Sequence, residues 1–162
     1  MASCTTNSFT DGELVATLPD ATQVYDIEQV TDIPAGVPHV DWAWDEPSVH
    51  FLCEIKDPES GYAVDDEDGV DAILRRIDEG SYLIHLADKA RFTSLHHSPS
   101  HRGPKTYIAV IAIEALTGAA LDAAGLGITR ALRDSGVTFP AIAVNIARWN
   151  VVLDPRRLVR EL

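Results

Sequence analysis

Apolar and polar residues alternate along the first third of the chain in a way that predicts strands. Residues 24–30 alternate at period two, which is typical of a half-buried strand. Residues 39–44 and 49–56 form two further strand-like runs, separated by the turn-forming sequence 45–48. These two runs together predict a hairpin.

Later in the chain the apolar positions follow a helical spacing or form unbroken runs. Residues 106–113 are apolar almost throughout, as expected for a central strand covered on both faces, and residues 141–147 predict another buried strand. Near the N-terminus, Thr10 and Glu13 form a capping-box pattern, which predicts a short helix ending at Pro19. The other segments expected to be helical are 70–77, 82–95, 119–133 and the tail 155–162.

The order of these elements predicts an α/β fold with a mixed central sheet flanked by helices. A chain of 162 residues, 46% of them hydrophobic, is of the size of one domain. We therefore expect residues 1–162 to form a single domain, with residues 1–8 as a flexible N-terminal segment.

No apolar run approaches the ~20 residues that a membrane-spanning helix needs, and the first residues lack the pattern of a secretory signal. Cys4 and Cys53 are the only cysteines, which suits a reducing compartment better than a disulfide framework. The interpretation is a cytoplasmic protein that does not enter the membrane, with Cys53 as a small core residue.

The net charge of −12 and the isoelectric point near 4.7 count against a protein that holds nucleic acid by general electrostatics. The charges are uneven, however, because acidic residues crowd 57–71 whereas 96–105 and 148–160 are basic. A local cationic face is compatible with this distribution. If nucleic acid is bound, we expect a homodimer or a complex with a more basic protein.

Three charged residues in the predicted hairpin point to metal chemistry. Glu54 and Lys56 are two residues apart on a strand, so they project to the same face, and the hairpin can bring Asp41 alongside. Two carboxylates can bind a hard cation such as Mg²⁺ through oxygen. The ammonium group can orient water or stabilise charge in the transition state.

Val40-Asp41, a short turn and the run ending Cys53-Glu54-Ile55-Lys56 resemble the core motif of the PD-(D/E)XK, or restriction-endonuclease-like, nucleases, with Val40 in place of the motif's proline. The family's order of helix, three strands, helix and strand is similar to residues 10–117. The resemblance implies a nuclease that cleaves DNA in preference to RNA with Mg²⁺, or Mn²⁺ in its place. It implies Asp41 and Glu54 as metal ligands and Lys56 as a catalytic group, in a setting such as a defence system.

Several further residues are candidates for the same site. By the resemblance, Glu13 on the first helix is a third metal ligand, although its capping role explains it equally well. Lys89 and Arg91 on the following helix either face the substrate or are surface charges. Histidines and cations of the loop 96–104, which we expect near the substrate entrance, are further candidates for substrate binding. They are His97, His101 and Arg102.

A second hypothesis is a binding module. In that reading the chain keeps the nuclease-like fold but is catalytically inactive, and it acts as an acidic binding or regulatory subunit that covers a basic partner. Activity with a divalent metal separates the two hypotheses.

Overall fold

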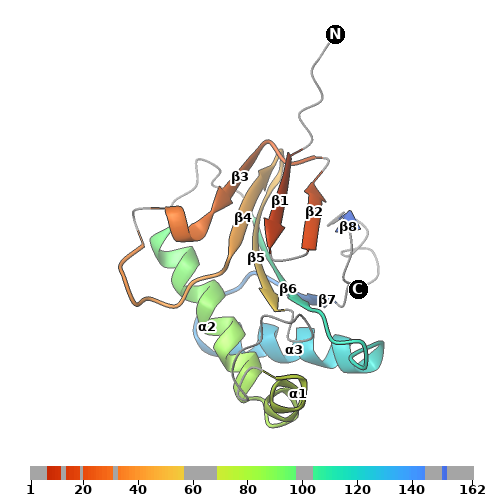
Figure 1. Ribbon diagram of the computed structural model, residues 1–162. Helices are drawn as coiled ribbons and strands as arrows, with labels where there is room; N and C mark the ends of the chain where they lie inside the picture. Colours follow the sequence, from red (N-terminus) through yellow and green to blue (C-terminus); the bar gives the residue numbers. More distant parts are fainter. Residues whose placement is uncertain are drawn as a thin grey trace.

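The computed structural model describes residues 7–11, 14–18, 20–30, 33–56, 69–97, 104–144 and 151–152. Its centre is a five-stranded mixed sheet in the order β3-β4-β5-β6-β7 (Figure 1). β3, β4 and β5 are antiparallel neighbours, whereas β5, β6 and β7 run parallel. The strand bounds are β3 Gln23–Asp26, β4 Trp42–Glu46, β5 Val49–Lys56, β6 Lys105–Ile111 and β7 Ala141–Val144.

The predicted hairpin and the predicted strand after residue 104 are confirmed, with differences at their ends. Asp45 and Glu46 continue β4 rather than forming the turn, which leaves Pro47 and Ser48 as the two turn residues. β3 stops at Asp26 because its carboxylate accepts a hydrogen bond from Glu28 N at 3.1 Å and caps a 3-10 turn, η1 (Ile27–Gln29). β6 is an interior strand as expected, but β5 is the middle strand of the sheet.

The predicted helix at residues 10–18 is wrong. β1 (Asn7–Asp11) and β2 (Leu14–Leu18) form an antiparallel hairpin there, and β2 also pairs in parallel with the two-residue strand β8 (Val151–Val152). Apolar side chains of the hairpin pack on the central sheet, where the rings of Phe9 and Trp42 stack with centroids 4.6 Å apart. This burial, which no local signal specifies, favours strands over the capped helix.

All three predicted internal helices are confirmed. They are α1 (Val70–Asp78), α2 (Ser81–His96) and α3 (Ala119–Asp134). Gly80 joins α1 to α2 with φ of +81°, a left-handed conformation that favours glycine. Residues 145–147 and the predicted tail helix 155–162 lie outside the described residues. Within the part of the chain that the structure describes, no helix is long and apolar enough to cross a membrane.

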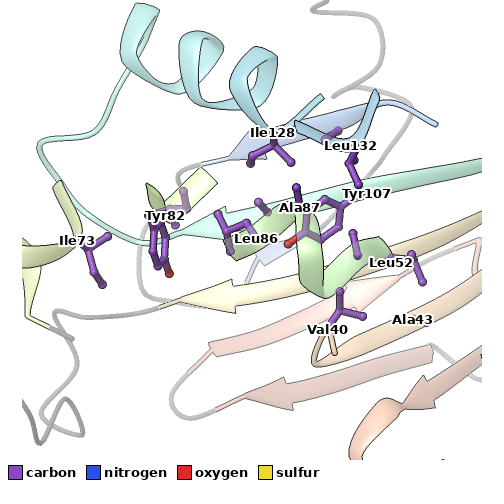
Figure 2. Close-up of a cluster of buried hydrophobic side chains, with 14 of the residues drawn as sticks. Val40, Ala43, Leu52, Ile73, Tyr82, Leu86, Ala87, Tyr107, Ile128 and Leu132 are labelled. Carbon is purple, nitrogen blue, oxygen red and sulfur yellow. The ribbon is translucent and has the colours of Figure 1, made fainter. Parts of the chain in front are cut away.

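The central sheet has two different coverings. The helices pack on one face, where Leu52 and Tyr107 of the sheet meet Leu86 of α2 and Ile128 of α3 (Figure 2). The hairpin β1–β2 covers the opposite face, over a second cluster that contains Trp44, Phe51 and the fully buried Cys53. The expectation of a mixed sheet flanked by helices is therefore confirmed, with the described helices on one face of the sheet. The expectation that Cys53 is a core residue is confirmed.

Candidate functional site

β5 places Glu54 and Lys56 on the helix-covered face of the sheet. Side chains alternate along a strand, so residues an even number of positions from Leu52 face the helices, whereas Cys53 and Ile55 face the β1–β2 hairpin. Glu54 is therefore carried beneath α2, where its side chain is nearly fully buried. Lys56, at the end of the strand, is half-buried.

Asp41 lies immediately before β4, next to Glu54. The last paired residues of β4 and β5 are Trp42 and Cys53, so one further step of the register sets Asp41 opposite Glu54, on the same face. Two hydrogen bonds fix the position of Asp41. Ile55 N donates to Asp41 Oδ2 at 2.8 Å, and Ile27 N donates to the Asp41 carbonyl at 3.1 Å. The two carboxylates predicted to share a site are thus cross-strand neighbours.

α2 contributes a third charged group, Lys89, whose ammonium contacts Glu54 Oε1. Lys89 is one turn from Leu86 and one turn from Thr93, both of which are buried, so it lies on the flank of the helix that faces the sheet. Thr93 Oγ1 accepts a hydrogen bond from Val40 N at 2.9 Å, which ties α2 to the segment that carries Asp41. The helix therefore holds Lys89 against the two carboxylates.

The environment of Glu54 disfavours its charged form. Burial, followed by the negative charge of Asp41, raises the pKa of Glu54 to about 8, although Lys89 and Lys56 oppose the shift. Glu54 Oε2 is buried and accepts no hydrogen bond from any residue that the structure describes. A buried carboxylate oxygen without a donor is costly, and a cation or a proton at this oxygen would relieve that cost.

The donor set fits a hard divalent cation. Mg²⁺ is usually held by one or two carboxylates, with water and substrate phosphate completing its coordination, and Asp41 and Glu54 supply two carboxylates. The fit is limited to these two groups, since the described residues include no cluster of three or more His, Cys, Asp or Glu side chains suited to a metal. Glu13, the predicted third ligand, lies outside the described residues.

The structure does not bring the remaining predicted residues together at this site. Arg91 is two residues beyond Lys89 and so points to another side of α2, where it pairs with Asp88 at 3.2 Å and stacks on Phe92. His97 is buried at the C-terminal end of α2. His101 and Arg102 lie outside the described residues, as does most of the predicted entrance loop.

A buried polar cluster at the opposite end of β5 was missed at the level of sequence. His50 is fully buried, and its Nδ1 lies 2.6 Å from Asp45 Oδ1, while the hydroxyl of Tyr25 donates to Asp45 Oδ2 at 2.8 Å. The ring of His97 lies 5.4 Å from that of His50, centroid to centroid. Burial lowers the pKa of His50, against the effect of Asp45, and so favours the neutral form of the ring. The alternation of β5 was the available signal, since it puts His50 on the same face as Glu54.

The charged groups around Glu54 extend further than the sequence motif indicated. Lys89 and Lys56, which act on Glu54, also lower the pKa of His85, together with burial and the charge of Arg76, whereas Asp88 opposes the shift.

Comparison of the chain with protein-family models, with curated proteins and with solved structures finds no match. The function is therefore argued from this site.

Proposed function

We propose that this protein is a metal-dependent nuclease that hydrolyses phosphodiester bonds, with Asp41 and Glu54 as ligands of Mg²⁺ or Mn²⁺. The observation that carries the proposal is the buried carboxylate of Glu54, which lies beside the second carboxylate of Asp41 and in contact with the ammonium group of Lys89. Two like charges held together in a buried site repel, so the arrangement is unfavourable unless a cation or a proton joins it.

In this proposal each residue of the site has its own role in hydrolysis. Asp41 and Glu54 would hold the ion through carboxylate oxygens. Lys89 contacts Glu54 and favours its ionised form, and Lys56, on the same face of β5, would orient the attacking water or stabilise the charge that develops on the phosphate. When bound, the metal supplies polarisation of the phosphate and a lowered pKa for a bound water.

We propose that DNA is the preferred substrate over RNA, in keeping with the resemblance to PD-(D/E)XK nucleases. That resemblance is in the motif strands and not in the N-terminal segment, where a β-hairpin stands in place of the family's first helix. The cytoplasmic location, the role in a defence system and the association with a homodimeric or more basic partner remain parts of the same proposal.

Cleavage assays with matched variants test the proposal. Wild type should cleave single- or double-stranded DNA only with Mg²⁺ or Mn²⁺, and Asp41→Asn or Glu54→Gln should abolish cleavage. Lys56→Ala should bind the metal but turn over ~10²–10³-fold more slowly, if it acts as a typical stabiliser of transition-state charge. Asp134→Asn, at an exposed position on α3, is the control and should behave as wild type.

A specific observation favours the second candidate, an inactive acidic binding subunit. Lys89 already contacts Glu54 Oε1, so an internal cation occupies part of the site. Thermal unfolding separates the two functions. A metal present at 100 times its dissociation constant stabilises the folded state by ~2.7 kcal/mol, which corresponds to a rise in melting temperature of roughly 5–10 °C. No rise with Mg²⁺ or Mn²⁺, together with no cleavage, would support the binding subunit.

A further inference from the structure

A row of cationic and aromatic side chains leads away from Glu54 along α2 to the end of α1. Lys89 contacts Glu54, and His85 precedes it by four residues, about 6 Å along the helix axis. The ring of Tyr82 lies 6.1 Å from that of His85, centroid to centroid. The guanidinium carbon of Arg76 lies 5.1 Å from the centroid of the Tyr82 ring. These groups are continuous with the carboxylate site.

The row concentrates positive charge in an acidic protein. Burial, followed by the charges of Lys89, Arg76 and Lys56, lowers the pKa of His85, and Asp88 is the acidic residue that opposes them. Asp88 is itself paired with Arg91. Cations gathered in this way repel one another, and an anion placed among them would relieve that repulsion.

The burial of Tyr82 indicates which part of a nucleic acid the row contacts. The ring of Tyr82 is only 3% exposed, so it supports Arg76 and leaves no face on which a base could stack. The groups of the row that reach solvent are the imidazole of His85 and two cations, the guanidinium of Arg76 and the ammonium of Lys89. Cations of this kind contact phosphate oxygens, which position a strand without reading its sequence.

We propose that Arg76, His85 and Lys89 form a track that holds consecutive phosphate groups of one nucleic-acid strand beside the Asp41–Glu54 site. The track rests on the proposed function, because it supplies the substrate strand to the carboxylates. It binds the backbone without sequence preference, and it takes the strand away from Glu54 along α2 towards the C-terminal end of α1.

The test is binding without cleavage, measured by fluorescence anisotropy in EDTA with a labelled 12-nucleotide single strand of DNA and with the matching duplex. For each variant the dissociation constant is recorded from 50 to 200 mM salt. Losing one phosphate contact reduces the slope of log K against log salt by ~0.7 on the single strand and ~0.9 on the duplex. Arg76→Gln should show this loss, with binding to the single strand about fivefold weaker at 0.1 M salt.

Two further variants make the result independent of folding defects. His85→Arg adds a permanent cation to the track, so it should tighten binding and steepen the slope by a similar amount, which a misfolded protein cannot do. Arg133→Gln removes an exposed cation from α3 and should leave both quantities unchanged.

The outcomes separate the track from the proposed hydrolysis. Equal weakening by Arg76→Gln and Arg133→Gln, no gain from His85→Arg, or no binding of either oligonucleotide at 50 mM salt would overturn the track, even if wild type cleaves DNA. The expected pattern of binding in a protein that cleaves nothing with Mg²⁺ or Mn²⁺ would support the track and refute the hydrolysis.

Discussion

Replacing Glu54 by Gln should change how the stability of the protein depends on pH. In the folded state the pKa of Glu54 is raised by burial and by Asp41 from 4.5 to about 8. Between these two values the folded protein holds a proton that the unfolded chain has released. The free energy of unfolding should therefore fall as the pH rises through this window, and the loss should be complete above pH 8.

The size of the effect follows from the same shift. At ~1.36 kcal/mol for each pKa unit, the whole window corresponds to about 5 kcal/mol as an upper value. Between pH 6 and pH 9 the loss attributable to Glu54 is about 3 kcal/mol. The variant Glu54→Gln keeps the size of the side chain but has no proton to release, so its stability should lack this component.

Urea unfolding at pH 6, 7, 8 and 9 in EDTA, followed by tryptophan fluorescence, measures the difference between the two proteins. Glu28→Gln, at an exposed position, is the matched control and should follow wild type. His50 and His85 have lowered pKa values, so they affect stability below about pH 6.5 and equally in both proteins. Parallel profiles for wild type and Glu54→Gln from pH 6 to pH 9 would refute the reasoning.

Three other predictions concern the surroundings of the site. Lys89→Met should destabilise the protein more at pH 9 than at pH 6, measured by urea unfolding, because only the ionised Glu54 needs a counter-ion. His50→Phe should cost ~1–3 kcal/mol at pH 7.5, since Asp45 loses a partner, yet it should lose less stability than wild type between pH 6.5 and pH 5. Gly125→Ala should lower the melting temperature, because a Cβ would lie 3.1 Å from a backbone nitrogen of β7.

The local patterns of the sequence predicted the part of the fold that carries Glu54. Alternation along 49–56 and the turn before it were enough to predict the β4–β5 hairpin, and its register then places Asp41 beside Glu54. The N-terminal hairpin was not predicted, because the capping-box pattern of Thr10 and Glu13 competes locally with a strand. Packing of the hairpin on the central sheet decided between them, and that contact is distant in sequence.

Only the part of the candidate site that the hairpin strands carry was predictable, because strand periodicity specifies which side chains share a face. The sequence predicts Lys89 on the helix after the motif strands, and its helical spacing from Leu86 and Thr93, which are buried in the structure, indicates that it faces the sheet. The contact of Arg76 with Tyr82 depends on the angle at which α1 meets α2, and the contact of His97 with the buried His50 depends on how α2 crosses the sheet. No spacing in the sequence specifies those crossings.

The central claim is that Asp41 and Glu54 share a divalent cation. Its most direct test is a crystal structure of the wild-type protein soaked in 10 mM Mn²⁺ at pH 8.5, with anomalous data collected for manganese. The account predicts an anomalous peak ~2.0–2.3 Å from a carboxylate oxygen of each residue, with the ammonium of Lys89 displaced from Glu54 Oε1. No peak at the carboxylates, with Lys89 still in contact with Glu54, would contradict it.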